Sequence, residues 1–366
     1  MRICSLKNLK AKNTDLDQYF QANSVSIDPL QLYDITGKQG WFIGNPAEFN
    51  LKKKIESNGK PLKDWDINIY KGLMTGCNEA FYIDKNKKDE LIKQDPKSAD
   101  LIFENFRGRE IKKYITDYSG DSYVIVTIDE LDINKYPAIQ QHLELYQNKL
   151  ESRAQFIRGD HKWYSVDNCP SQKMLDSFKK SKIIYPNMTQ NPVFCLDNKC
   201  SISNDKTFIL TANDDDMNYI LGFLNSTLCR FMLRIICPQL GDKGLELRKV
   251  FFSQLPIPIL DTTDKQELAR QIEVLVEQIL LVKGNPNNPR SVATILNKGQ
   301  TQATNLDIDS KTLGENQVKN SPLLREYPHS GGGLYHSTTE LEAQIDQLVY
   351  QLYDLTADEI AVVEEN

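Results

Sequence analysis

Two segments near the C-terminus share one apolar spacing, which restricts the possible folds more than any other feature of the chain. Apolar residues step by four, three, four and three positions in both: Leu268, Ile272, Leu275, Ile279 and Val282, then Leu341, Ile345, Leu348, Leu352 and Leu355. Such spacing places one apolar seam along each of two helices. Because the seams have equal length, we expect an antiparallel helical hairpin over 261–283 and 339–366.

Composition divides the chain into regions of different character. Residues 284–338 are rich in Asn, Gly, Pro, Ser and Thr, which predicts a long flexible linker. The net charge of −6 alone argues against a nucleic-acid-binding protein. However, residues 261–366 hold 17 Asp and Glu against 8 Lys and Arg, whereas residues 51–260 hold 31 Lys and Arg against 28 acidic residues. A basic face on the middle region is therefore compatible with the composition.

The cysteines and the hydropathy bear on the compartment. The seven Cys are scattered and odd in number, which suits reduced thiols better than a disulfide framework. No run approaches the roughly 20 apolar residues of a membrane helix. We therefore expect a cytoplasmic protein without membrane contact.

Short strands and helices alternate in the middle region without a regular β-α-β rhythm, which predicts an α+β fold. A strand, a turn and a second strand are expected over 69–83. Further strands are expected at 123–128, 182–185, 192–196 and 207–210. Helices are expected at 46–58, where Gly59 ends the helix, at about 95–103, where Asp95-Pro96 begins it, and at 137–154 and 218–236.

Several short motifs follow one another in a fixed order. They are Gly72-x-x-Thr75-Gly76-x-Asn78-x-Ala80-Phe81, Phe106-Arg107-Gly108-Arg109-Glu110-Ile111, His161-Lys162-Trp163, Leu221-Gly222-x-Leu224-Asn225-Ser226 and Leu255-Pro256-Ile257-Pro258. Together they resemble the TaqI-like C-terminal specificity domain, the target-recognition domain of type IIG restriction–modification enzymes and adenine-specific DNA methyltransferases. Glu110 stands where the family usually has Asp. The ordered set is specific, although no single motif is.

The resemblance implies a DNA target-recognition domain over 51–260, with a curved, mostly antiparallel sheet in the major groove of double-stranded DNA. Residues 1–50 are then the lead-in from a methyltransferase domain that is missing here. Asn191-Pro192-Val193-Phe194 is not the catalytic Asn-Pro-Pro-Tyr motif, because Val replaces the second Pro. We expect no cofactor in this chain; AdoMet and Mg²⁺ belong to the missing methyltransferase and endonuclease domains, which are the expected partners.

Candidate DNA contacts are the cationic and amide side chains that could reach phosphates or base edges. Arg107 and Arg109 have two alternative roles: they contact DNA, or they form structural ion pairs with Glu104 or Glu110. Asn78 reads a base or, as we favour, stabilises a turn. The full set is Lys71, Asn78, Arg107, Arg109, Lys112, Arg153, Arg158, His161, Lys162, Asn187, Gln190, Lys243, Arg248 and Lys249.

Other functions remain open from the sequence. A type I restriction specificity-like subunit is one, although such subunits usually carry two recognition domains. A helical protein-interaction scaffold is another, favoured by the acidic tail. A nuclease built on Asp100, Glu110 and Lys112 is disfavoured, because Asp100 falls on a predicted helix and Glu110 lies within the family motif.

Overall fold

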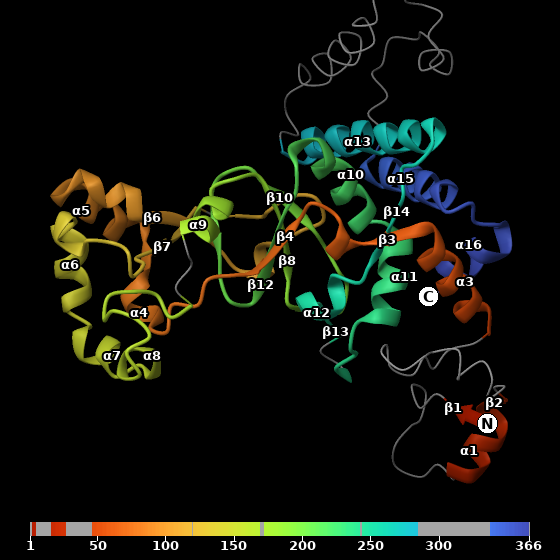
Figure 1. The fold of residues 1–366 in the computed structure, drawn as a ribbon, viewed down its shortest axis with the longest axis horizontal. Coiled ribbons are helices and arrows are strands. Elements are labelled where there is room, and N and C mark those ends of the chain that lie inside the picture. The colour runs from red at the N-terminus through yellow and green to blue at the C-terminus, as the bar shows by residue number, and fades with distance from the viewer. Residues whose placement is uncertain are drawn as a thin grey trace, which may run out of the picture.

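The computed structural model describes residues 2–4, 16–26, 46–118, 120–168, 172–241, 244–284 and 337–365. In Figure 1 a small lobe of short helices and strands lies on the left, a sheet lies in the centre, and a helical body lies on the right. The expected α+β fold is confirmed, with sheets that are mostly antiparallel. Most of the predicted linker, 285–336, lies outside the described residues, as does much of the expected lead-in.

The central sheet has the order β10 (Cys195–Asp197), β8 (Lys182–Pro186), β12 (Thr207–Thr211) and β4 (Asn68–Lys71), with every pair antiparallel. Both faces of β8 and β12 are buried. Ile184 and Ile209 point to the core of the small lobe, and Tyr185 and Phe208 to that of the helical body. Burial on both faces explains why these strands read as continuous apolar runs rather than as alternating patterns.

A second sheet extends into the small lobe. Its order is β11 (Ile202–Ser203), β6 (Ile102–Phe106), β7 (Ser122–Ile125) and β5 (Tyr82–Asp84). β11 is parallel to β6, and the other pairs are antiparallel. The two sheets meet where the turn from β11 leads into β12.

The prediction of one hairpin over 69–83 is wrong. β4 pairs with β12, whereas β5 pairs with β7 in the other sheet, and the short helix α4 (Asn78–Phe81) lies between them. Gly72 explains the divergence, because its backbone N–H donates to Thr207 O at 2.9 Å. A Cβ at Gly72 would lie 2.0 Å from Asn204 O, so only glycine permits this approach.

The single helix expected over 137–154 is also wrong, since three short helices replace it: α6 (Pro137–Glu144), α7 (Gln147–Glu151) and α8 (Ala154–Ile157). Arg153 interrupts the helix with an extended backbone at φ −68° and ψ 142°. This conformation sends its side chain into the lobe.

The apolar helix expected over 218–236 is two helices, α10 (Asp214–Leu224) and α11 (Thr227–Ile236), bent by 78°. Asn225 breaks the helix because its side chain bonds both the N–H and the carbonyl of Phe194. Ser226 then caps α11 by accepting from the Cys229 N–H. In the described part of the chain no single helix meets the length and hydropathy of a membrane span; this bent pair meets them only jointly.

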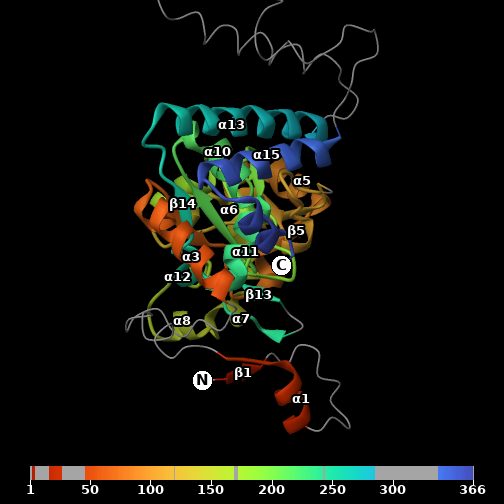
Figure 2. The same ribbon diagram turned by 90° about the vertical axis from the view of Figure 1, so that its right-hand side faces the viewer.

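The helical hairpin is confirmed: α13 (Thr263–Gly284) and α15 (Thr338–Leu352) pack together beside α10 (Figures 1 and 2). Lys283, at the end of α13, lies 3.1 Å from the carboxylate of Glu342, near the start of α15, so the two helices are antiparallel. Gly222 of α10 faces Ile272 and Val276 of α13. The hairpin therefore shares its core with the central sheet.

The remaining elements cover the sheets or join them. The helices are α1 (Leu16–Asn23), α3 (Pro46–Asn58), α5 (Lys85–Gln94), α9 (Gln172–Phe178), α12 (Lys249–Phe252) and α16 (Ala357–Glu364). The 3-10 turns are η1 (Leu62–Asp64), η2 (Pro96–Leu101), η3 (Gly108–Glu110) and η4 (Ile133–Lys135). The short strand pairs are β1 (Arg2–Cys4) with β2 (Ser24–Ser26), β3 (Gly59–Pro61) with β14 (Pro256–Pro258), and β9 (Met188–Thr189) with β13 (Leu245–Glu246).

Candidate nucleic-acid interface

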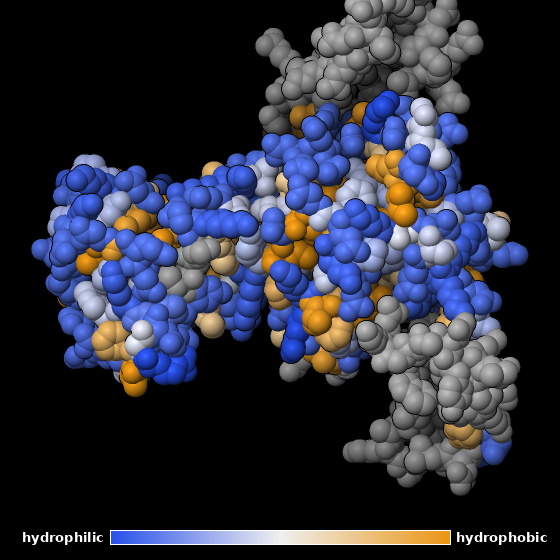
Figure 3. Space-filling view, viewed as in Figure 1, coloured by the Kyte–Doolittle hydropathy of each residue, from blue (hydrophilic) through white to orange (hydrophobic). Residues whose placement is uncertain are grey.

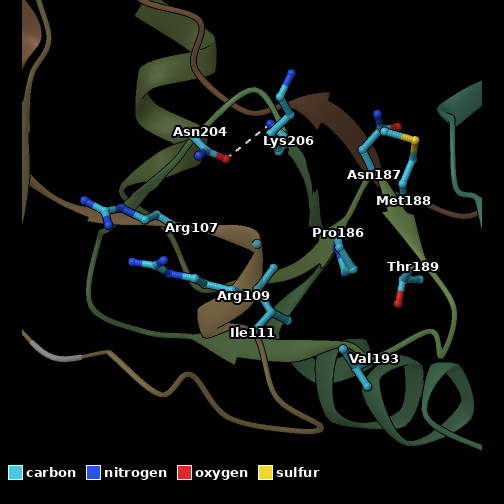
Figure 4. Close-up of a pocket in the computed structure, with 11 residues that line it drawn as sticks. Arg107, Arg109, Ile111, Pro186, Asn187, Met188, Thr189, Val193, Asn204 and Lys206 are labelled. Atoms are coloured by element: carbon cyan, nitrogen blue, oxygen red, sulfur yellow. Dashed lines mark hydrogen bonds between the residues drawn. The ribbon is translucent and has the colours of Figure 1, made fainter. Parts of the chain in front are cut away.

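Three segments that are far apart in the sequence line one open groove of about 580 Å³ (Figure 4). They are the η3 turn after β6, the loop that follows β8, and the turn before β12. Most of its lining side chains are cationic or carry an amide or hydroxyl group. The lining residues are Arg107, Gly108, Arg109, Ile111, Pro186, Asn187, Met188, Thr189, Val193, Asn204 and Lys206.

Arg107 and Arg109 present two exposed guanidinium groups at one side of the groove. Figure 4 shows both side chains extending in the same direction from the η3 turn. The carboxylate of Glu110 accepts from the Arg107 backbone N–H at 2.9 Å and so caps the turn without neutralising a guanidinium. Among the described residues Arg109 has no acidic partner. The only hydrogen bond that the Arg107 guanidinium donates to a described residue is a long one, at 3.4 Å, to the Ser122 hydroxyl. The ion pairs with Glu104 or Glu110 considered from the sequence do not form.

Backbone hydrogen bonds fix the opposite wall of the groove. Asn187 donates its N–H to Lys206 O at 2.8 Å, and its own carbonyl accepts from Leu247 N at the same distance. Gly244, at φ +81°, lies against the loop so closely that a Cβ would meet Thr189 O at 2.3 Å. The loop after β8 is thus held between the β12 turn and β13.

Of the lining residues, only Arg107, Arg109 and Asn187 were among the predicted contacts; those that the sequence did not indicate include Met188, Asn204 and Lys206. Lys206 is exposed and pairs with its neighbour Asp205 at 3.0 Å. The side-chain oxygen of Asn204 accepts from the Lys206 N–H. The polar string Asn204-Asp205-Lys206 could have indicated a turn, but nothing in it showed that the turn meets the Arg107 segment.

Some predicted contacts lie outside the groove lining. Lys71 is exposed at the end of β4, and Lys112 is exposed beyond η3. Lys249 donates to Ile69 O at 3.1 Å, and Arg248 pairs with Glu246 at 2.7 Å while its side chain stays 61% exposed. Gln190 is exposed next to the groove loop, whereas Lys243 lies outside the described residues.

Arg153 cannot contact DNA as predicted, because the structure buries it. Its guanidinium donates to the carbonyls of Thr75 at 3.0 Å and Trp163 at 2.8 Å, and its Nε to that of Leu150 at 2.9 Å. Asp167 lies 3.5 Å away. Burial lowers the pKa of Arg153, whereas the nearby charge of Asp167 acts in the opposite direction and raises it. Arg153 therefore joins three parts of the small lobe.

The family motif around Gly76 belongs to the same structural unit. Gly76 has φ +71°, and a Cβ there would lie 2.5 Å from the carboxyl carbon of Asp167. Thr75 donates its hydroxyl proton to the side-chain oxygen of Asn78 at 2.7 Å. This is the turn interpretation that the sequence favoured for Asn78. The motif therefore shapes the lobe.

Arg158, His161 and Lys162, which were predicted as DNA contacts, lie on one loop of the small lobe, and Asp129 holds much of this loop. Its carboxylate bonds His161 Nδ1, the Lys162 N–H and the Ser165 hydroxyl, each within 2.8 Å. Burial raises the pKa of Asp129, but these hydrogen bonds outweigh it, so the net pKa is lowered. Arg158 is exposed and pairs with Asp160, and the Lys162 side chain is exposed over Tyr164. None of these residues lines the groove.

In the described ranges no three His, Cys, Asp or Glu side chains are grouped so that they could hold a metal ion. The carboxylates considered for a nuclease are separated accordingly. Asp100 lies in η2, and Glu110 caps η3.

The groove lies inside a region that matches a known family. Residues 104–257 match the model of the TaqI-like C-terminal specificity domain. We refer to these residues as the TaqI-like domain. The resemblance stated from the motifs is thus confirmed, and every residue that lines the groove falls within the TaqI-like domain.

One curated methyltransferase and two solved structures are also similar to this chain. The chain is 27% identical over 238 residues to the type II methyltransferase M.MjaIV of Methanocaldococcus jannaschii, covering 62% of this chain and 76% of that protein. Two solved structures are similar at 14% identity: the type IIL restriction–modification enzyme MmeI in complex with DNA (TM-score 0.48) and the type IIG restriction endonuclease BpuSI (TM-score 0.39). They cover 84% and 85% of this chain, which spans about a third of their length, 36% and 34%.

Proposed function

We propose that this chain recognises a target sequence in double-stranded DNA, as the specificity part of a restriction–modification enzyme. The observation that carries the proposal is the position of the groove inside the TaqI-like domain, where Arg107 and Arg109 are exposed and have no acidic partner among the described residues. An anionic ligand would supply the missing partners, and the DNA backbone is a regular array of such anions.

Recognition divides between two kinds of side chain. Guanidinium groups bind phosphate oxygens through charge-assisted hydrogen bonds, which fix the position of the duplex without reading its sequence. Amide and hydroxyl groups on the opposite wall, at Asn187 and Thr189, are the kinds of group that read base edges. Because backbone hydrogen bonds hold both walls, little conformational entropy is lost on binding.

Catalysis belongs to other domains in this proposal. An adenine-specific methyltransferase domain supplies the AdoMet site and transfers the methyl group, and an endonuclease domain supplies the Mg²⁺ site, as in a type IIG enzyme. This chain would position the duplex for both reactions. In this proposal its own residues hold phosphates and read bases.

The test is a fluorescence-anisotropy titration of the chain with random and genomic duplexes at several salt concentrations. It is run alone and with any adenine methyltransferase encoded beside it. Arg109→Ala should weaken binding about tenfold for all sequences, since one charge-assisted hydrogen bond is lost. The slope of log K against log salt should fall by about 1. Arg270→Ala on α13 is the matched control, because Arg270 is exposed and far from the groove in sequence.

Arg270→Ala should leave the affinity and the salt slope unchanged. Equal losses in the two variants would show that the groove has no special role. If the wild-type chain binds no duplex in a salt-dependent way, alone or with the methyltransferase, DNA recognition is refuted and a protein-interaction scaffold becomes the better account.

A further inference from the structure

We propose that Asn187 and Met188 together read one A·T base pair in the major groove, Asn187 at the adenine and Met188 at the thymine methyl group. The inference rests on the proposed function and deepens it, because it assigns a base pair to two named side chains. Both residues line the groove opposite the arginines, at the same end in Figure 4.

Met188 is an apolar side chain exposed in polar surroundings. It is 44% exposed on β9, whereas Pro186 two positions earlier is buried. The visible surface in Figure 3 is mostly hydrophilic, with small apolar patches between polar regions. The backbone of Met188 pairs with Glu246 of β13, and its side chain belongs to neither of the two hydrophobic cores of the described residues. Contact with an apolar group of the duplex would bury the exposed part of the Met188 side chain.

Asn187 carries an amide without a partner. Its side-chain oxygen is buried and makes no hydrogen bond to any described residue. Leaving such an atom unpaired costs roughly 1–3 kcal/mol. Asparagine often occupies loops because it tolerates positive φ, but the described non-glycine residues with positive φ are Tyr114, Cys200 and Asp354. Neither backbone conformation nor local hydrogen bonding accounts for Asn187, and turning the amide toward a base would relieve the cost.

The chemistry of the A·T pair fits this combination. In the major groove adenine presents the N7 acceptor and the N6 donor, which one asparagine amide can bind together. Its partner thymine presents a methyl group that favours apolar contact. A G·C pair presents two guanine acceptors and no methyl group, so the Asn187 oxygen would face an acceptor and Met188 would lose its contact.

The experiment uses two base analogues that each remove one group. Duplexes bound by the chain, with its methyltransferase if required, are first selected from a random pool. Each thymine of the selected site is then replaced by deoxyuridine, which lacks the methyl group, and each adenine by 7-deazaadenine, which lacks N7. For the wild-type protein, one base pair should show a loss of about fourfold with deoxyuridine and roughly fivefold with 7-deazaadenine.

Variants then show which side chain causes each of the two losses of affinity. Met188→Ala should abolish the deoxyuridine effect and keep the 7-deazaadenine effect, and Asn187→Ala should do the reverse at the same base pair. Leu240→Ala is the control, because Leu240 is 39% exposed and does not line the groove. It should keep both effects, and matching melting curves show that each variant is folded.

The outcomes separate this inference from the proposed function. Selection of a specific duplex whose analogue effects survive Met188→Ala or Asn187→Ala would overturn the inference and leave DNA recognition standing. Effects that map to two different base pairs would also overturn it. If no duplex is selected, the proposed function fails and the inference falls with it.

Discussion

Replacing Arg153 should unfold the small lobe rather than remove a DNA contact. The side chain is 7% exposed and donates to the carbonyls of Leu150, Thr75 and Trp163, all at 3.0 Å or less. Its charge faces Asp167, itself only 11% exposed. Arg153→Ala would leave three carbonyls without this donor and one carboxylate without its cation.

The magnitude follows from these contacts. Removing one partner of a buried ion pair costs about 3–5 kcal/mol, because the other charge stays buried. The lost hydrogen bonds are not additive with this cost, so we expect about 4 kcal/mol for Arg153→Ala. Arg153→Lys should also destabilise, by about 2 kcal/mol, because an ammonium group lacks the planar fork that reaches the separate carbonyls.

Urea unfolding followed by tryptophan fluorescence measures the loss, since Trp163 is one of the acceptors. Arg158→Ala is the matched control: its ion pair with Asp160 is exposed, and such pairs contribute about 0–1 kcal/mol. A free energy of unfolding for Arg153→Ala within about 0.5 kcal/mol of the wild-type value would refute this role for Arg153. It is equally refuted if Arg153→Ala weakens DNA binding while unfolding at the same urea concentration.

Three further predictions concern the core and the hairpin. Lys182 and Asp197 form a fully buried pair at 2.6 Å, so Lys182→Met should destabilise by about 3 kcal/mol in denaturant titrations, and unchanged stability would contradict this. Gly222→Ala puts a Cβ 2.5 Å from Ile272, so it should lower the melting temperature with a cost of about 1–3 kcal/mol; a neutral effect would show that α13 does not pack as described. Burial, then the charge of Asp216, raises the pKa of Glu273 to about 7. The protonated Glu273 side chain stabilises the fold fully below pH 4.5, which is the pKa of a glutamate in the unfolded chain, and this stabilisation is lost as the pH rises to 7. Glu273→Gln should therefore reduce the fall in stability across this window by about 1–2 kcal/mol, and an identical pH profile would refute the assignment.

The elements that depend on residues close together in the sequence, such as helix caps and apolar strands, were predicted correctly. Asp95 accepts from the Lys97 N–H and caps η2, as the Asp-Pro pair indicated. The helix over 46–58 ends where Gly59 was expected to end it. The apolar runs of β8 and β12 were correctly assigned because burial on both faces makes the middle positions of both strands apolar or aromatic.

Long-range contacts decided the features that the sequence analysis missed. Nothing near Arg153 shows that carbonyls 10 and 78 residues away will accept its protons. The strands on either side of Gly72 separate because Thr207 binds the glycine backbone. The groove joins segments near residues 107, 187 and 206, so the arginines and Asn187 could be proposed singly, but their meeting with Lys206 could not.

Photo-crosslinking of a selected duplex that carries 5-iodouracil tests the central claim most directly. Tryptic peptides joined to DNA are identified by mass spectrometry. The account predicts crosslinks within 186–193 and 104–111, which line opposite walls of the groove. Crosslinks confined to α13 and α15, with none in those two segments, would contradict it.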